Sequence, residues 1–360
     1  MSHTNTTDHL LIFRVDTREK EKGARALERC LILAEAHVAR GGQVAFALGE
    51  AQGAASEVIA ARGFRRIPIT ASVGSKEDSE QLLRAVSDGG AKAVVVEGRK
   101  FASDYLKALA SKVYTAVIEQ GGERVLPVQL IINSSFSADE HFYTCRADSR
   151  LLLGPKFKLV RQDLRAWPKP EQPSGDVVEE VNSERVFVTS SDDHTSARIL
   201  DAMPSPSKTT IITLLGSRSC SDLDQSARAA CARGYIVEQI SRSTLTDCLP
   251  FCDLAIVTNE SFSGQIGYLG IPTLCLSKDR DSSREVHRMA EEGANMHTPP
   301  LSETNHQELT QAIRDFLVDE PQRKRFGKRI ESMIDGNGAN RILGCIEQAV
   351  MPRLHVLKAA

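Results

Sequence analysis

The stretch Leu10-Leu-Ile-Phe-Arg-Val-Asp16 is followed by a polar segment, Thr17 to Gly23, and by a longer segment, Ala24 to Arg40. The first stretch has the length of a buried β-strand, and the third segment repeats apolar residues with the spacing of one helix face. Gly41-Gly42 marks the end of the helix, before a second apolar stretch, Val44-Ala-Phe-Ala-Leu48. Strand, helix and strand in this order predict a βαβ unit whose two strands run parallel.

The loop that follows Asp16 is the first candidate site. In parallel α/β sheets, ligands bind beyond the carboxyl ends of the strands. Alternating strands and helices with glycine stops continue to residue 133, which predicts a parallel α/β domain. We expect strands at Arg66 to Thr70, Lys92 to Glu97 and Val128 to Asn133, and helices at Glu50 to Arg62, Lys76 to Asp88 and Asp104 to Glu119.

The segment Trp167 to Asp176 separates two similar halves of the chain. It contains three prolines and one glycine in ten residues, a composition that does not continue a helix or a central strand. We therefore expect an N-terminal domain at residues 1–166, a linker at 167–180 and a C-terminal domain at 181–340. The remaining residues, 341–360, are expected to contain a closing helix.

The second half repeats the alternation of strands and helices. Its buried strand Leu254 to Thr258 leads into a polar stretch, Thr258 to Gln265, which we interpret as a loop at the ligand-binding edge of the sheet. Together the two halves predict an α/β protein with two doubly wound Rossmann-like domains that face each other across a cleft. This architecture is called GT-B in glycosyltransferases.

Composition excludes several classes of function. The chain has 360 residues, of which 26% are charged, and a formal net charge of −2, so it offers no electrostatic argument for binding nucleic acid. Neither a signal peptide nor an apolar run of the roughly 20 residues that span a bilayer is evident. Of the eight cysteines, Cys248 and Cys252 are the closest pair, which is a weak zinc signal. We expect reduced thiols, a cytoplasmic location, no metal and no cofactor.

Motifs spread over nearly the whole chain resemble those of one family. They are Arg14-Val-Asp16, Arg29-Cys-Leu-Ile-Leu-Ala34, Leu152-Leu-Gly-Pro-Lys-Phe-Lys-Leu-Val-Arg161 and Asp335-Gly-Asn-Gly-Ala-Asn-Arg341, with Leu269-Gly-Ile-Pro272 as a weaker match. They are similar to motifs of the UDP-sugar hydrolases of pseudaminic acid biosynthesis and of related spore-coat polysaccharide proteins. The resemblance implies a GT-B fold, a UDP-sugar or similar small molecule as ligand, and a closing helix that packs back on the N-terminal domain.

The chain departs from this family where the chemistry is expected. Ala26 stands at the position of the family's catalytic His, and Arg25 stands at the glycine before it. Alanine cannot transfer a proton, so that mechanism is absent unless another group replaces it. The family's Asp-His-Tyr reads Glu97-Gly-Arg99, and its Gly-Gly-Ser-Asp turn reads Ser190-Ser-Asp192. Gln265 replaces a Glu that would hold the ribose hydroxyls, and it keeps one acceptor without the charge.

Asp16 is the candidate catalytic residue, and Arg14, Arg25, Glu97 and Arg99 are the candidate substrate-binding residues. Asp16 would bind substrate hydroxyls or orient a loop, or would only cap the following helix. Arg25 would clamp a phosphate or carboxylate at the helix N-terminus, or would be a solvated side chain. Glu97 and Arg99 would pair with each other or face the cleft.

Nucleotide binding is expected at the ends of strands in the C-terminal half. The candidate residues are Ser190, Asp192, Gly216, Ser217, Ser261, Gln265 and Arg280. For each loop the alternative is a polar turn that binds nothing. Asp279-Arg-Asp281 is interpreted as helix capping and not as a metal motif, and His194 as a turn residue.

Two functions stay open at this point. The first is a nucleotide-sugar-binding protein of surface polysaccharide or nonulosonic acid biosynthesis, which acts as a UDP-sugar hydrolase or as a glycosyltransferase. In that case Arg25 and Arg280 would neutralise the leaving diphosphate. The second is a catalytically inactive relative that binds a sugar or a partner enzyme as a scaffold. The sequence does not predict the oligomeric state.

Overall fold

A computed structural model describes residues 9–49, 53–121, 123–166, 183–190, 192–215, 220–241, 244–258 and 260–351. The chain divides into two compact units. One unit contains the residues up to Leu159 together with those from Asn337 onward, and the other contains Val160–Gly336. The predicted linker, 167–180, lies outside the described residues.

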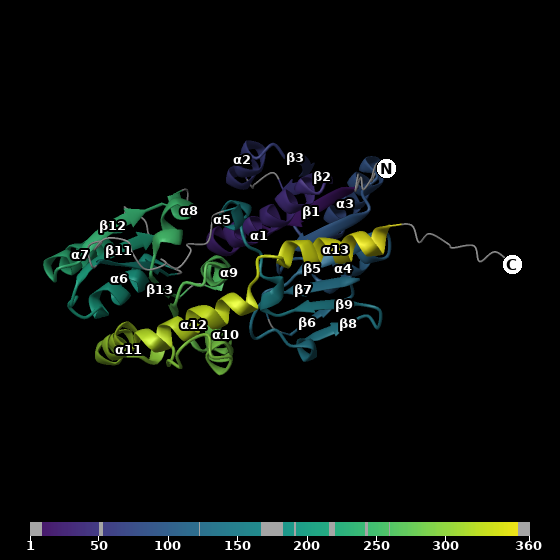
Figure 1. Ribbon diagram of the computed structural model, residues 1–360. Coiled ribbons are helices and arrows are strands. Elements are labelled where there is room, and N and C mark those ends of the chain that lie inside the picture. Colours follow the sequence, from purple (N-terminus) through teal and green to yellow (C-terminus); the bar gives the residue numbers. More distant parts are fainter. Residues whose placement is uncertain are drawn as a thin grey trace, which may run out of the picture. The chain divides into compact units, whose positions relative to one another are not determined.

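The first unit is built on a parallel sheet of seven strands, counted within the described residues. In spatial order the strands are β3 (Arg65–Ile69), β2 (Gln43–Gly49), β1 (Leu10–Val15), β4 (Ala93–Glu97), β5 (Tyr114–Ile118), β7 (Leu130–Asn133) and β9 (Arg150–Leu153). A short parallel pair, β6 (Arg124–Leu126) and β8 (Tyr143–Cys145), lies outside this sheet. The order reverses at β1, because the chain winds first to one side of β1 and then to the other (Figure 1).

Helices cover both faces of this sheet. Because side chains alternate along a strand, Leu11, Phe13 and Val15 lie in one hydrophobic core, whereas Ile12 lies in another. The first core is shared with α1 (Lys20–Ala39), α2 (Gly53–Ala61) and α13 (Gly338–Val350), and the second with α3 (Lys76–Gly89) and α4 (Ser103–Ala110). The prediction of a doubly wound α/β fold is therefore confirmed for this half.

One predicted helix of the first unit is wrong. The stretch Asp104 to Glu119 was expected to be a single helix, but α4 ends at Ala110 and is followed by β5. The residues of β5 read Tyr-Thr-Ala-Val-Ile, and β-branched and aromatic side chains favour a strand that is packed on both faces. The strand pairs with β4 and β7, so it is an interior strand of the sheet.

The second unit contains a parallel sheet of five strands within the described residues. Their spatial order is β12 (Ile236–Ile240), β11 (Thr209–Leu215), β10 (Ser183–Thr189), β13 (Leu254–Val257) and β14 (Thr273–Cys275). Here the order reverses at β10, in the same way as at β1 in the first unit. The prediction of a second Rossmann-like half is confirmed.

Helices connect these strands and complete the second unit. They are α5 (Gln162–Ala166), α6 (Asp193–Ala202), α7 (Ser221–Ala232), α8 (Leu245–Cys248), α9 (Glu260–Tyr268), α10 (Arg280–Glu291), α11 (His306–Val318) and α12 (Glu320–Met333) (Figure 1). A core of buried side chains from α6, α11 and the sheet, among them Ile199, Ile212 and Ile313, fixes the positions of the strand ends.

The last helix, α13, returns to the first unit. Its side chains Ile342 and Leu343 are fully buried in the core that contains β1 and α1. Arg40 at the end of α1 donates from Nε to Glu347 Oε1 at 3.0 Å. At the start of the helix, a Cβ on Gly338 would lie 2.2 Å from the Lys158 carbonyl oxygen. The backbone approach at that position therefore requires glycine.

Candidate functional site

Each sheet has a switch point at its carboxyl edge, where the strand order reverses. In open α/β sheets, ligands bind in the crevice at this point. In the first unit the crevice lies between the ends of β1 and β4, and in the second unit between the ends of β10 and β13. Several of the residues proposed from the sequence follow these four strands directly.

At the first switch point, Asp16 is held by Arg18. Arg18 donates from Nε to Asp16 Oδ1 at 2.8 Å and from Nη2 to Oδ2 at 2.9 Å. Burial alone would raise the pKa of Asp16, but the hydrogen bonds and charge of Arg18 outweigh it, so the pKa lies below the ordinary value. A carboxylate with a lowered pKa is a poor base at neutral pH, and it remains a good acceptor for hydroxyl groups.

Glu97, at the end of β4, is buried with 3% of its surface exposed. Arg29 on α1 donates from Nε to Glu97 Oε1 at 2.7 Å, and the Cys30 thiol lies 3.4 Å from Oε2. Burial raises the pKa of Glu97 to about 7, although the Arg29 charge opposes this. The predicted pairing of Glu97 with Arg99 is wrong, because Glu97 pairs with Arg29 instead.

The two strand ends approach each other at Gly98. The Asp16 N–H donates to the Glu97 carbonyl oxygen at 2.9 Å, and a Cβ on Gly98 would lie 2.7 Å from Asp16 Cβ. Gly98 also has a φ of 144°, which favours glycine. Arg99 follows with an exposed side chain, and within the described residues it makes no ion pair or hydrogen bond. Its guanidinium lies against Gly121, in the segment after β5, because a Cβ on Gly121 would lie 2.1 Å from Arg99 Nη2.

The structure places Arg14 away from any surface that a substrate could reach. Its side chain is fully buried and donates from Nε and Nη2 to the two oxygens of Asp78, at 3.0 and 2.7 Å. Asp78 also accepts from the Tyr105 hydroxyl at 3.1 Å and from the Gly74 N–H at 2.8 Å. This network ties β1 to α3 and α4, and the predicted contact between Arg14 and a substrate does not fit it.

Helix α1 begins earlier than expected, and this changes the positions of Arg25 and Ala26. The helix begins at Lys20 and not at Ala24. Arg25 is therefore in the second turn, where it is half-buried, and not at the helix N-terminus as expected. Ala26 is buried, with 6% of its surface exposed, in the core that contains Val15. A proton-transferring side chain at position 26 would therefore have to displace core atoms.

At the second switch point, Ser190 and Asp192 organise the turn between β10 and α6. Asp192 caps α6 by accepting from the Thr195 N–H at 2.8 Å. The Ser190 hydroxyl donates to the Asp192 carbonyl oxygen and lies 2.8 Å from the Ser196 hydroxyl. These bonds fix the backbone at the point where a nucleotide would approach the sheet.

Lys278 is a residue of this edge that the sequence analysis missed. Its Nζ lies 2.9 Å from Asp192 Oδ2. Burial opposes ionisation of Asp192, but the bonds from Lys278 and Thr195 lower its pKa to about 2. Lys278 follows β14 almost directly, and its position after a strand was the signal available in the sequence.

The polar stretch after β13 is a helix and not a loop. Helix α9 begins at Glu260, so the interpretation of Thr258 to Gln265 as a loop is wrong. Gln265 lies within α9 with 3% of its surface exposed, and its Oε1 has no hydrogen-bond partner among the described residues. Ser277, after β14, is similarly buried with an unpartnered hydroxyl in the part of the chain that the structure covers. Buried acceptors of this kind call for a water or ligand partner.

Four further candidates are not placed at this edge by the described residues. Gly216 and Ser217 are outside the described residues, as is the placement of the Ser261 side chain. Arg280 does not face a site: its side chain is 84% exposed and pairs with Glu303. Its neighbour Asp279 caps α10 in a capping box with Ser282, which confirms the capping interpretation.

His194 and the acidic groups give no sign of a metal centre. His194 is exposed in the first turn of α6, with Nδ1 3.7 Å from Asp222 Oδ2. Within the described ranges, no group of three His, Cys, Asp or Glu side chains is placed to bind a metal ion. No helix in the same part of the chain is both long enough and apolar enough to cross a membrane.

The fold is shared with solved glycosyltransferases. No protein-family model matches the chain, and neither does any curated protein. MurG of Acinetobacter baumannii is 10% identical, with a TM-score of 0.66 over 95% of this chain and 99% of its own. Spinosyn forosaminyltransferase SpnP is 13% identical, with a TM-score of 0.65 over 96% and 99% of the two chains.

The glycosyltransferase VinC, solved in complex with DTDP, is also similar. It is 13% identical, with a TM-score of 0.59 over 95% of this chain and 99% of its own. At these identities the likeness concerns the fold alone. Two parallel α/β units with matching strand orders, and similarity over nearly the whole length of these enzymes, show that this chain has the GT-B fold of glycosyltransferases.

Proposed function

We propose that this protein is a glycosyltransferase that uses a nucleotide sugar, with the donor nucleotide at the switch point of the second unit. The ion pair between Lys278 and Asp192 is the main support. Asp192 follows β10 and Lys278 follows β14, while β13 lies between these two strands. The pair therefore crosses the carboxyl end of β13, where the crevice of a doubly wound sheet receives its ligand.

In this proposal, Lys278 carries the positive charge for the diphosphate. A diphosphate needs cationic partners as it leaves, and the N-terminus of α6 adds a favourable dipole. Asp192 alone would repel the phosphates, but its pairing with Lys278 leaves the edge without net charge. The unpartnered Gln265 Oε1 would accept from a ribose hydroxyl.

The acceptor would bind at the switch point of the first unit. Arg99, which has no ion pair or hydrogen bond among the described residues, would offer its guanidinium from the segment after β4, and Asp16 would offer carboxylate oxygens to hydroxyl groups. In the transfer, a bond forms between the acceptor oxygen and the anomeric carbon, the bond from that carbon to the diphosphate breaks, and UDP leaves with the electron pair. The acceptor hydroxyl gives its proton to a base or to solvent.

Transfer is favoured over hydrolysis by the position of Ala26. The resembled hydrolases use a His at that position, whereas here the side chain lies in the core. We further propose UDP as the nucleotide, the cytoplasm as the location, and surface polysaccharide or nonulosonic acid synthesis as the process, all on the strength of the motif resemblance.

A second candidate is a nucleotide-sugar-binding protein without turnover. It is favoured by the state of the two carboxylates at the first switch point. Asp16 has a lowered pKa, and Arg29 and Cys30 occupy the oxygens of Glu97. Asp16 is therefore a poor base at neutral pH, and both oxygens of Glu97 are already engaged within the protein.

Release of UDP distinguishes these functions. UDP-N-acetylglucosamine, UDP-glucose and UDP-galactose would each be incubated with the protein, with and without a mixture of saccharide acceptors. A transferase releases UDP only when an acceptor is present, and a hydrolase releases it in water alone. Saturable UDP binding without release in either case would establish the second candidate. Absence of both binding and release would refute both functions.

A further inference from the structure

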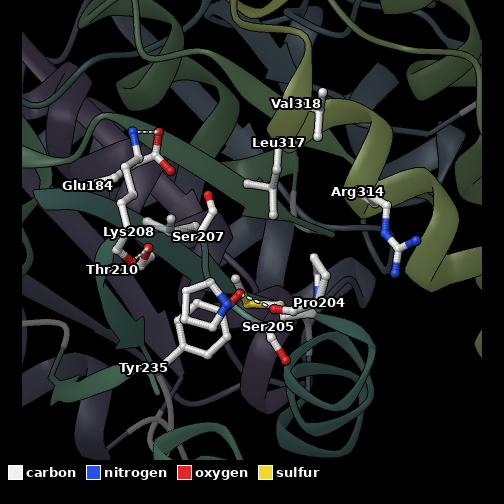
Figure 2. A pocket seen from close by; sticks show the side chains of 13 residues that line it. Glu184, Pro204, Ser205, Ser207, Lys208, Thr210, Tyr235, Arg314, Leu317 and Val318 are labelled. Atoms are coloured by element: carbon white, nitrogen blue, oxygen red, sulfur yellow. Dashed lines mark hydrogen bonds and ion pairs between the residues drawn. The ribbon is translucent and has the colours of Figure 1, made fainter. Parts of the chain in front are cut away.

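A cavity of about 390 Å³ lies in the second unit, away from the switch point (Figure 2). Its lining includes Glu184, the second residue of β10, Thr210, the second residue of β11, and Tyr235, which directly precedes β12. Because these strands are parallel, their amino ends share one edge of the sheet. The cavity is therefore at the opposite edge from Asp192 and Lys278.

The cavity has a fixed apolar wall. Val186 and Met203 are buried beneath it, and Pro204, Pro206 and Leu317 line its sides. The Tyr235 hydroxyl donates to the Pro204 carbonyl oxygen. This hydrogen bond holds the segment that contains Pro204 and Pro206 in place. Ligand pockets in proteins commonly have volumes of roughly 300 to 1,000 Å³ and mostly apolar linings, and this cavity is of that kind.

Positive charge exceeds negative charge around the cavity. Lys208 Nζ lies 3.2 Å from Glu184 Oε1. Arg323, buried behind this wall, has Nη2 3.4 Å from the same oxygen. Glu184 is thus already neutralised.

Arg314 supplies the charge that is not neutralised. Figure 2 shows it on the side of the cavity opposite Lys208 and Glu184. It has no ion pair or hydrogen bond within the described residues. The Arg314 side chain is exposed, and a guanidinium group binds a carboxylate with paired hydrogen bonds.

We propose that this cavity is a second binding site, which takes a small organic carboxylate with an apolar body. The carboxylate would pair with Arg314, and the apolar body would lie against Pro204, Pro206 and Leu317. The ligand class follows from an apolar wall combined with one unpaired cation. This site does not depend on the function proposed for the switch point, since it uses none of the same residues.

Calorimetric titration with 2-naphthoate tests the site directly, with 2-naphthalenemethanol as the uncharged analogue. We expect saturable binding of one naphthoate per chain, and binding of the alcohol that is weaker by about tenfold or more. Arg314→Ala should weaken naphthoate binding by a similar factor. Arg325→Ala is the matched control, because Arg325 is an exposed and unpaired arginine on α12, and it should leave binding unchanged.

A blocking variant tests the location. Ser207 is exposed and lines the cavity, so Ser207→Trp should fill the mouth without disturbing the core, and circular dichroism would check that the variant is folded. We expect it to abolish naphthoate binding. No saturable binding by the wild type, equal binding of acid and alcohol, or unchanged binding in folded Ser207→Trp would each overturn the proposal.

Discussion

Lys278 Nζ lies 2.9 Å from Asp192 Oδ2 across the end of β13, although 86 residues separate the two in the chain. Their parent strands, β14 and β10, are not neighbours in the sheet. The pKa of Asp192 is lowered to about 2, because the bonds from Lys278 and Thr195 outweigh the effect of burial. The pair therefore stays ionised through the whole neutral range, and a bound diphosphate would compete with Asp192 for Lys278.

Asp192→Asn should raise the affinity for UDP. The substitution removes the carboxylate that competes for Lys278, while asparagine still caps α6 as well as aspartate does. We expect the dissociation constant to fall by about three- to tenfold, the scale of one weakened charge interaction. Calorimetric titration at fixed ionic strength measures it. Unchanged UDP affinity would mean that Asp192 does not compete with the phosphates for Lys278.

Glu97→Gln should change how stability depends on pH. The folded state keeps the Glu97 proton up to a pKa of about 7, whereas the unfolded chain loses it near the ordinary glutamate pKa of 4.5. The stability that this group contributes is thus present at low pH and is lost as pH rises through about 7. Glutamine cannot ionise. Between about pH 5 and pH 8, the free energy of unfolding of Glu97→Gln should therefore rise by about 2 kcal/mol relative to that of the wild type.

Urea unfolding at several pH values provides the measurement for this variant. Glu80→Gln is the matched control, since the Glu80 side chain is half exposed and pairs only loosely with Lys76 at 3.9 Å. Parallel pH profiles of Glu97→Gln and the wild type would contradict the assignment.

Arg14→Met should strongly destabilise the first unit. The substitution leaves Asp78 charged in the interior, where its remaining side-chain partners among the described residues are the Tyr105 hydroxyl and the Gly74 N–H. Removing one member of a buried ion pair costs about 3 to 5 kcal/mol. The control is Lys76→Met, at an 85% exposed side chain, which should cost less than about 0.5 kcal/mol. Similar losses for the two variants in urea unfolding would refute a structural role for Arg14.

Ala26→His should lower stability without creating a hydrolase. The side chain at position 26 points into a packed core, where overpacking costs about 1 to 3 kcal/mol. Ala24→His, at an exposed position of the same helix, should cost little. UDP release from UDP-sugars in water should stay at the wild-type level in both variants, and a gain in hydrolysis by Ala26→His would show that the position faces a site.

Local patterns predicted most elements of the fold. The strand β4, at Ala93–Glu97, agrees with the expected Lys92 to Glu97 within one residue, because apolar runs between glycine or polar turns leave few alternatives. Failures occurred where tertiary packing overrides local preference. The end of α4 and the start of β5 carry no glycine or proline, and α9 contains Ser and Gly residues that disfavour a helix in isolation.

The site was harder to predict, because its interactions join distant segments. Asp16 and Glu97 were placed correctly at strand ends by the βαβ pattern, since that pattern alone fixes which loops share an edge. Their partners Arg18 and Arg29 depend on how side chains meet in space, and so does the pairing of Lys278 with Asp192. The sequence pattern also gave no means to tell that Arg14, one residue before a strand end, points into the core.

The most direct test of the central claim is a comparison of UDP and uridine binding by the wild type and by Lys278→Ala. Lys324→Ala, at an exposed lysine of α12, is the control. We expect the wild type to bind one UDP per chain, and Lys278→Ala to weaken UDP by about ten- to hundredfold, the scale of a lost charged hydrogen bond, while uridine affinity and Lys324→Ala stay unchanged. Absence of saturable UDP binding by the wild type at millimolar concentration, or equal UDP affinity in Lys278→Ala, would contradict a diphosphate site at this edge.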